Sequence, residues 1–346
     1  MVLAIVVAAA IGSPAASAAA LRLDRLGPVV GSVERPAARS HALAYWTKAR
    51  IRAARPLEEI VVDRPGQEAA RPVASVVPDR GPSFSVSGAA PGLGIPGQLR
   101  IRGRGPARPG AVSPDRTAAR RASTFIRYPL EAPDHDPEAY PNTAHGKVFS
   151  HFPGNGGEDY VCSATVVPSN TMSVAMTAGH CLYQRDKGGF ARNVVFVPAY
   201  HSGDAGGIAP LGHFAARKLW IPRGWQAHQY VSLDVAAISL AANESGGLVE
   251  DVAGSRGIRF NRKRSTALDA YGYPTEPPFD GITPWVCDAH TTGSDDGAAN
   301  LPGPTPLQIA CDLTGGASGG GWIVNQGPDP RLAPGFLFSV TSYRYQ

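Results

Sequence analysis

The sequence lacks several patterns that would identify common classes of protein. None of its apolar runs reaches the roughly 20 residues that a membrane-spanning helix needs. Glycine does not recur at every third position and no heptads run through the chain, which excludes a collagen and a long coiled coil. Its histidines form no H-E-x-x-H and its cysteines no C-x-x-C, so a zinc site has little support and we expect no metal.

Positive charge is concentrated in the first part of the chain. Residues 1–145 carry 19 Lys and Arg against 12 Asp and Glu, whereas the remainder carries 14 against 16. A basic, arginine-rich segment can bind nucleic acid. Here the arginines are scattered among prolines and acidic residues, with no aromatic side chains repeated between them. We therefore expect no nucleic-acid partner.

Residues 1–18 are predicted to be a signal peptide. Residues 2–11 form a short apolar run, and small residues follow as far as Ala16-Ser17-Ala18. This matches the apolar region and the A-x-A-type cleavage site of an export signal, although the usual basic start is missing. A disordered, alanine-rich tail is the alternative. The signal predicts a secreted, extracellular protein.

The four cysteines are expected to form two local disulfides. An even number of cysteines in an exported chain is typical of disulfide bonding. Their spacing pairs Cys162 with Cys181 and Cys287 with Cys311.

Residues 19–145 are predicted to be a pro-region or linker that is mostly extended or disordered. They are rich in Ala, Arg and Pro and show little periodic apolar pattern, so they bury too little apolar surface to offset the entropy of ordering. One helix is expected over residues 40–55, with Ser40 as its N-cap. Candidate processing sites within this segment are Arg120, Arg121 and Arg127.

Residues 146–346 are predicted to be an all-β domain. Short runs rich in β-branched residues alternate with turns of Gly, Pro, Asn and Asp, which is typical of a sandwich or barrel. The strands are expected at residues 147–149, 160–167, 174–177, 194–197, 235–240 and 335–342. About 200 residues with two disulfides can form two small β-barrels.

Three segments of this domain carry residues with catalytic chemistry: His180, Asp234 and Ser318. A serine hydroxyl is a poor nucleophile unless an imidazole takes its proton and a carboxylate orients that imidazole. Each segment alone has a simpler explanation, namely a structural histidine, a turn aspartate or a flexible glycine run. Together, in the order His, Asp, Ser and next to cysteines, they favour a catalytic triad. An esterase of the α/β-hydrolase type would place the serine first and the histidine last.

These segments resemble a secreted bacterial serine peptidase of the chymotrypsin fold, in the branch of the glutamyl endopeptidases and their trypsin-like relatives. The resemblance rests on residues 162–167, 177–181, 234–236, 271–274 and 316–320. It implies two six-stranded antiparallel β-barrels with the site between them. His180 would act as general base and acid, Asp234 would orient it, and Ser318 would be acylated. The N–H groups of Gly316 and Ser318 would form the oxyanion hole. The expected partners are protein or peptide substrates, with no organic cofactor and with a monomeric enzyme.

Three features depart from the family pattern: Ala317, the end of the chain, and Gly321, which stands where proline often follows the two glycines. Ala317 stands where relatives activated by a new N-terminus have aspartate, so we do not expect that mode of zymogen activation. A pro-segment that blocks the site or assists folding remains compatible with the sequence. The chain stops at Gln346, before the last strand and helix of the family, so we expect its C-terminus to be truncated.

Substrate specificity is weakly encoded. Asp312 lies six residues before Ser318, where trypsin-like relatives have a pocket residue that selects Arg or Lys. Ser342 begins the segment that resembles the strand lining this pocket. The alternative for Asp312 is a solvated loop residue. The alternative function is a catalytically impaired, peptidase-like binding module. A structure in which His180 lies far from both Ser318 and Asp234 would favour this module over an active peptidase.

Overall fold

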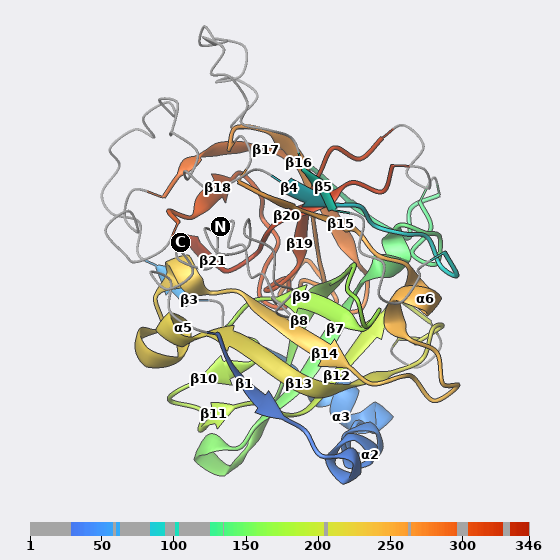
Figure 1. Cartoon of the computed structure of the whole chain (residues 1–346). Coiled ribbons are helices and arrows are strands. Elements are labelled where there is room, and N and C mark those ends of the chain that lie inside the picture. Colours follow the sequence, from blue (N-terminus) through green and yellow to red (C-terminus); the bar gives the residue numbers. More distant parts are fainter. Residues whose placement is uncertain are drawn as a thin grey trace, which may run out of the picture.

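Strands arranged in two large sheets dominate the computed structural model of the chain, and the two sheets lie one above the other in Figure 1. The structure describes residues 29–57, 60–62, 84–93, 101–103, 125–133, 135–203, 207–261, 264–295, 304–327 and 333–345. The predicted signal peptide, Arg120, Arg121 and Gln346 lie outside these residues.

The first sheet is a closed, six-stranded antiparallel barrel. Its strand order is β13-β12-β7-β8-β9-β14, and pairing of β13 with β14 closes it. The strands are β7 (His145–Phe152), β8 (Glu158–Val167), β9 (Val174–Thr177), β12 (Arg192–Pro198), β13 (Phe214–Pro222) and β14 (Ala236–Leu240). Val148, Phe196 and Ile238 are fully buried inside it, so the β-branched and aromatic runs of the sequence form its core. A two-stranded hairpin, β10 (Tyr183–Gln184) and β11 (Gly189–Phe190), lies beside it.

The second sheet has nine strands, and its hydrogen-bonded order among the described residues is open. The order is β18-β17-β16-β19-β20-β15-β4-β5, and β6 pairs with β17. The strands are β4 (Phe84–Val86), β5 (Ile101–Gly103), β6 (Ile126–Pro129), β15 (Gly257–Phe260), β16 (Ala267–Gly272), β17 (Trp285–Ser294), β18 (Leu307–Ile309), β19 (Gly321–Val324) and β20 (Phe336–Val340). The predicted all-β class is confirmed.

The helices among the described residues are short. They are α2 (Pro36–Tyr45), α3 (Lys48–Ala53), α5 (Arg223–His228) and α6 (Val249–Ala253), with 3₁₀ turns η1 (Asn142–Ala144), η2 (Gly154–Gly156) and η3 (Val231–Leu233). None of the helices in the described ranges combines the length and the apolar character that a membrane span requires.

The two sheets are joined by an apolar cluster and by a buried arginine. The cluster contains Met176 and Val235 of the barrel together with Ile323 of the second sheet. Arg256 is fully buried and donates from Nε to Nε2 of His145 at 2.9 Å. Burial and the charge of Arg256 hold the pKa of His145 well below its usual value, so the ring stays neutral and can accept this bond. The contact fixes the barrel against the second sheet.

The described parts of residues 19–145, where a mostly extended or disordered segment is expected, include short extended strands that pair with both sheets. β1 (Val29–Val33) runs antiparallel to β13, and β2 (Arg55–Pro56) runs parallel to β8. β3 (Ile60–Val62) runs parallel to β21 (Tyr343–Tyr345). β4, β5 and β6 belong to the second sheet. Each strand is too short to be stable alone and gains its hydrogen bonds from a partner far away in the sequence.

The helix expected over residues 40–55 is two helices. α2 begins at Pro36, so Ser40 lies inside a helix and is not an N-cap. α2 ends at Tyr45, with Trp46 as its C-cap. Thr47 then caps α3 by accepting a hydrogen bond from the N–H of Arg50 at 3.3 Å. A threonine between two helical runs is the local signal that separates them.

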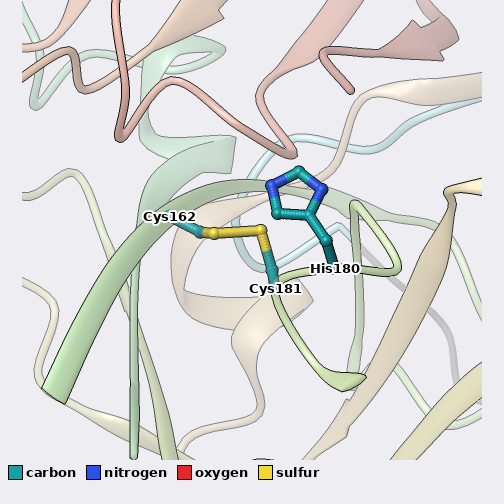
Figure 2. A group of neighbouring side chains, drawn as sticks. All are labelled: Cys162, His180 and Cys181. Atoms are coloured by element: carbon teal, nitrogen blue, oxygen red, sulfur yellow. A yellow bond between two sulfur atoms is a disulfide. The ribbon is translucent and has the colours of Figure 1, made fainter. Parts of the chain in front are cut away.

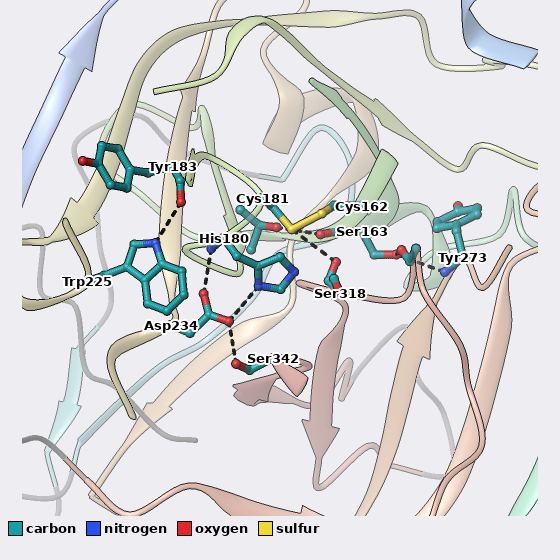
Figure 3. Close-up of a disulfide and its surroundings, with 12 residues drawn as sticks. Cys162, Ser163, His180, Cys181, Tyr183, Trp225, Asp234, Tyr273, Ser318 and Ser342 are labelled. Atoms are coloured by element: carbon teal, nitrogen blue, oxygen red, sulfur yellow. Dashed lines mark hydrogen bonds and ion pairs between the residues drawn. A yellow bond between two sulfur atoms is a disulfide. The ribbon is translucent and has the colours of Figure 1, made fainter. Parts of the chain in front are cut away.

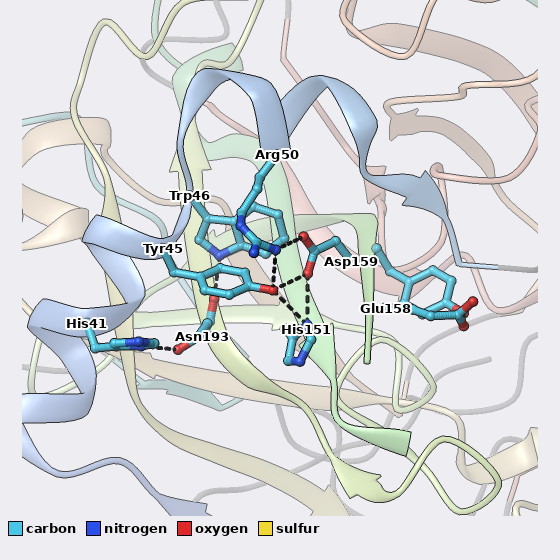
Figure 4. A network of polar contacts seen from close by, with 9 residues as sticks. His41, Tyr45, Trp46, Arg50, His151, Glu158, Asp159 and Asn193 are labelled. Atoms are coloured by element: carbon cyan, nitrogen blue, oxygen red, sulfur yellow. Dashed lines mark hydrogen bonds and ion pairs between the residues drawn. The ribbon is translucent and has the colours of Figure 1, made fainter. Parts of the chain in front are cut away.

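A polar network holds these helices against the barrel (Figure 4). Asp159 of β8 accepts hydrogen bonds from the hydroxyl of Tyr45 at 2.7 Å and from Nη1 of Arg50 at 2.9 Å. Its Oδ1 also lies 2.8 Å from Nδ1 of His151. Trp46 is buried beneath the network and donates from Nε1 to the carbonyl of Asn193. The N-terminal region is therefore docked on the barrel by side chains as well as by strand pairing.

Candidate active site

Strand pairing in the barrel brings His180 and Asp234 together. His180 follows β9 and Asp234 precedes β14, and the register places Thr177 opposite Ala236. Oδ1 of Asp234 accepts the backbone N–H of His180 at 2.7 Å, and Oδ2 lies 2.7 Å from Nδ1 of the ring (Figure 3). Both side chains are 0% exposed. A carboxylate can only accept, so Nδ1 carries the proton and Nε2 is left as an acceptor.

Three donors converge on the carboxylate of Asp234. Besides the two groups of His180, the hydroxyl of Ser342 donates to Oδ2. Gly179 leaves room for this arrangement, since a Cβ there would lie 2.9 Å from Oδ1 and 3.0 Å from the ring of Trp225. The carboxylate is thus buried, fully hydrogen-bonded and fixed in one orientation.

The loop that carries Ser318 is anchored to the barrel by Ser163 of β8. The N–H of Ser163 donates to the carbonyl of Ser318 at 2.7 Å, and its hydroxyl donates to the carbonyl of Gly316 at 2.8 Å. Gly319 has φ +79°, and a Cβ there would come within 2.0 Å of Oγ1 of Thr177. The loop therefore requires glycine at this position, because a side chain would displace it from the strand that precedes His180.

Two polar side-chain atoms in this site have no hydrogen-bond partner among the described residues. They are Nε2 of His180 and Oγ of Ser318, and both are buried. The two residues are near neighbours, since Sγ of Cys181, the residue after His180, lies 3.7 Å from the carbonyl oxygen of Ser318. Figure 3 shows Ser318 beside the ring of His180, on the side of the ring away from Asp234. An acceptor nitrogen and a hydroxyl left without partners are the two groups between which a proton would move.

The N–H groups of Gly316 and Ser318 are hydrogen-bonded to no other described residue. Those of the neighbouring Ala317, Gly319 and Gly320 donate to carbonyls of the protein. Gly316 adopts φ +96°. The two unpaired N–H groups are available to an oxygen that develops negative charge.

The residues expected to form a substrate pocket lie in different surroundings. Ser342 is 6% exposed and contacts Asp234, so the structure places it with the triad residues. The side chain of Asp312 is 46% exposed and forms an ion pair with Arg127 of β6. Arg127 itself lies within a strand paired to β17, with Cys287 opposite it. Asp312 is therefore a surface residue of this structure, which agrees with the alternative considered for it.

Both expected disulfides are formed, Cys162–Cys181 and Cys287–Cys311. Figure 2 shows the first beside the ring of His180, and these three residues offer atoms within 4.8 Å of one another, as a metal site would. Cysteine binds metals as a thiolate, however, and these two sulfurs are bonded to each other. Nδ1 of His180 is engaged by Asp234. The donor set does not fit a metal ion.

Ser163 positions the serine loop, a role that was not predicted from the sequence. Its hydroxyl bridges two chain segments, because it accepts the N–H of Tyr273 at 3.0 Å while donating to Gly316. A serine directly after a disulfide cysteine, within the mainly apolar run of residues 160–167, was the available signal.

No protein-family model matches the chain. An extracellular metalloprotease of Bacillus subtilis strain 168 is 26% identical over 141 residues, which are 41% of this chain and 42% of that protein, so the chain spans less than half the length of this curated relative. The crystal structure of the protease Anisep from Arthrobacter nicotinovorans is 33% identical, covering 59% of this chain and 85% of that one, with a TM-score of 0.50. The thermostable serine protease AL20 from an extremophilic microorganism is 35% identical, covering 59% and 86%, also with a TM-score of 0.50.

Proposed function

The chain belongs to the bacterial serine proteases of the chymotrypsin fold, and on that premise we propose that it is a secreted serine endopeptidase that acts through an acyl-enzyme on Ser318. The family and its fold confirm the resemblance found in the sequence. The reaction, the roles of the three side chains and the compartment are our proposal.

One observation carries the proposal. His180 is held through Nδ1 by a buried carboxylate, while its Nε2 and the hydroxyl of Ser318 are buried without partners among the described residues. A buried polar atom without a hydrogen bond costs about 1–3 kcal/mol, so two such atoms on neighbouring residues call for an explanation, which transfer of a proton between them would supply.

In the first step Ser318 attacks the carbonyl carbon of a peptide bond. Nε2 of His180 takes the hydroxyl proton as the bond from Oγ to carbon forms. The resulting imidazolium donates through Nδ1 to Asp234, which stabilises its positive charge. The carbonyl oxygen becomes an oxyanion, and the N–H groups of Gly316 and Ser318 would donate to it.

In the second step the tetrahedral intermediate collapses. The bond from carbon to nitrogen breaks, and Nε2 of His180 gives its proton to the leaving amine. An ester of Ser318 remains. Water then attacks this ester with His180 again as the base, and the carboxylic acid leaves as the hydroxyl of Ser318 is restored.

Secretion is supported by three features. The structure has two disulfides, which persist in oxidising compartments. The sequence begins with an apolar run and an A-x-A-type site. The curated relative from Bacillus subtilis is described as extracellular. Extended protein or peptide chains are the proposed substrates.

The proposal is tested with Ser318→Ala, compared with Ser150→Ala as a matched control. Ser150 is also a buried serine whose hydroxyl has no partner among the described residues, but it lies on β7 and not in the serine loop. Ser318→Ala should abolish labelling by an organophosphonate probe and lower kcat by about 10⁴-fold or more. Ser150→Ala should keep both within about twofold. Equal labelling of the Ser318→Ala protein and the parent chain would refute the assignment.

A further inference from the structure

A loop of the second sheet lies directly against the serine loop. It follows β16 and comprises residues 273–283, all of which the structure describes. The N–H and the hydroxyl of Thr275 donate to the carbonyl of Gly315 at 2.8 Å and 2.9 Å. A Cβ at Gly316 would lie 2.5 Å from the carbonyl oxygen of Tyr273 and 2.6 Å from Cγ2 of Thr275. The start of the 273–283 loop therefore packs against Gly316, whose N–H is one half of the proposed oxyanion hole.

Two neighbouring side chains of the barrel bind the 273–283 loop near its two ends. The hydroxyl of Ser163, on β8, accepts the N–H of Tyr273 at 3.0 Å (Figure 3). Nζ of Lys147, on β7, donates to the carbonyl of Gly281. Lys147 and Ser163 lie directly opposite each other in the β7–β8 pair, so both side chains project from the same face of the sheet. The barrel therefore holds the loop at two points.

The end of the loop that Lys147 binds is joined to the end that touches the serine loop. The N–H of Gly281 donates to the carbonyl of Pro274 at 3.0 Å. Gly281 has φ +73°, and a Cβ there would lie 3.0 Å from Cγ2 of Thr275. A shift of Gly281 would therefore move Pro274 and Thr275, and Thr275 is hydrogen-bonded to Gly315. Contacts connect the amine of Lys147 with the residue that precedes Gly316.

The amine of Lys147 is enclosed by aromatic side chains and by the 273–283 loop. Lys147 is 5% exposed, and its Nζ lies 5.4 Å from the ring centroid of Phe149 and 5.2 Å from that of Tyr200. Among the described residues, its one hydrogen-bond partner is the carbonyl of Gly281. Asp280 is the acidic group that acts on the amine, but its carboxylate accepts two N–H groups of the loop. Burial lowers the pKa of Lys147 to about 7, because the charged form loses its contact with water there.

We propose that Lys147 is a positioning residue for the oxyanion hole and acts through the 273–283 loop on the N–H of Gly316. It touches neither the substrate nor a reacting atom. The inference rests on the proposed endopeptidase function and adds a residue to its machinery. An apolar side chain of similar length would pack among these rings without the cost of desolvating an amine, so the amine serves the carbonyl of Gly281 and not the core.

Loss of this contact should affect the transition state more than substrate binding. The oxyanion forms only after attack on the carbonyl carbon, so a displaced N–H of Gly316 raises the barrier and leaves the affinity for the substrate nearly unchanged. Complete loss of one oxyanion donor lowers kcat by about 10²- to 10³-fold. Loss of the Lys147 amine would displace this donor without removing it. We therefore expect kcat to fall by about 10- to 100-fold, with KM changed less than about threefold.

The experiment compares Lys147→Met with Lys218→Met in the full chain. Methionine is close to lysine in length but cannot donate a hydrogen bond. Lys218 is also a barrel lysine beside an aromatic ring, with Nζ 3.5 Å from the centroid of Trp220, but it lies on β13. With kcat and KM measured on a chromogenic peptide, Lys147→Met should lose kcat as stated, and the control should keep both constants within about twofold. An unchanged kcat, or a change confined to KM, would overturn the inference.

A second measurement does not depend on catalysis. In a Ser318→Ala background, Lys147→Met should accelerate hydrogen exchange of the amides of Tyr273, Thr275 and Gly281 by at least about tenfold, whereas Lys218→Met should not. The amides of β7 and β8 should keep their rates, which shows that the barrel is folded. Unchanged exchange in the loop, or equal acceleration throughout the chain, would overturn the inference and leave the proposed function standing. Accelerated exchange confined to the loop, in a protein whose parent chain hydrolyses no peptide, would instead overturn the proposed function.

Discussion

Replacing Asp234 with asparagine should switch off the proposed base without changing the shape of the site. An amide has one oxygen and one NH₂ group where the carboxylate has two acceptors. If the NH₂ group took the place of Oδ1, it would face the backbone N–H of His180 at 2.7 Å, and that N–H cannot lose its proton. The NH₂ group should therefore take the place of Oδ2 and donate to Nδ1 of the ring. The imidazole proton then moves to Nε2, which can no longer accept the proton of Ser318.

The size of this effect follows from the roles of the two ring nitrogens. Loss of the correct tautomer in a triad lowers kcat by about 10⁴-fold, which corresponds to about 5 kcal/mol of transition-state stabilisation. Ser342→Ala is the graded comparison, because it removes one donor to Asp234 and leaves the tautomer unchanged. A single hydrogen bond to a charged group contributes about 1.5–3 kcal/mol at most, so this variant should lose roughly 10- to 100-fold.

Both variants are assayed for kcat/KM on a chromogenic peptide and for phosphonate labelling, beside the parent chain under the same conditions. The free energy of unfolding is measured in urea on the same preparations, because a lost fold would mimic lost catalysis. Asp234→Asn activity within tenfold of the parent chain, with folding intact, would refute the proposed role of Asp234. A larger loss of kcat/KM for Ser342→Ala than for Asp234→Asn would contradict the view that the tautomer of His180 matters more than the hydrogen bond from Ser342.

Three further predictions concern the loop, the disulfide and a buried lysine. Gly319→Ala places a Cβ 2.0 Å from Oγ1 of Thr177, so it should displace the serine loop and lower kcat/KM by about 100-fold, while activity near that of the parent would contradict the overlap. Replacing Cys162 and Cys181 with serine opens a loop of sequence separation 19 and should lower the free energy of unfolding by about 3 kcal/mol in urea titrations. Burial lowers the pKa of Lys147 to about 7, so the unfolded chain binds more protons between about pH 7 and 10, and the free energy of unfolding should rise with pH there, by up to about 1.4 kcal/mol per pH unit. Lys147→Met should flatten that slope, and an unchanged slope would show that Lys147 does not cause it.

The sequence was sufficient to predict the barrel and the residues of the candidate triad. Runs such as residues 160–167 and 174–177 have the β-branched composition of buried strands, and they fall within β8 and coincide with β9. His180 and Asp234 could be named because each adjoins such a run in a recognisable motif. Their hydrogen bonds could not be predicted, because they depend on the register between β9 and β14.

The structure of the N-terminal region was not predictable in the same way. β3 and β4 have three residues each, and β2 has two. Strands so short carry almost no periodic signal. Their partners β21, β15 and β8 all follow more than a hundred residues later in the chain. Composition alone therefore suggested an extended segment. The hydrogen bonds that organise it come entirely from tertiary pairing.

The position of Asp312 shows the limit of counting residues back from the serine. The spacing from Ser318 suggested a pocket residue, whereas the side chain of Asp312 is 46% exposed in the structure. Arg127, which was considered as a processing site, lies on β6 and forms an ion pair with Asp312 at the surface. A partner 185 residues away cannot be read from local spacing.

Ser163 and Ser318 differ in the hydrogen bonding of their hydroxyl groups. Both are buried, yet the hydroxyl of Ser163 is bonded on both sides, whereas that of Ser318 has no partner among the described residues. Ser150 shares this lack of a partner, so burial without a hydrogen bond is not sufficient evidence for catalysis. Ser318 differs because its loop is held beside His180, whose Nε2 is also unpartnered. The hydroxyl of Ser163, the carboxylate of Asp234 and Nδ1 of His180 all have hydrogen-bond partners. Only the side-chain atoms Nε2 of His180 and Oγ of Ser318, between which a proton would pass, are left without one among the described residues of this site. This difference in hydrogen bonding is the physical argument for the triad.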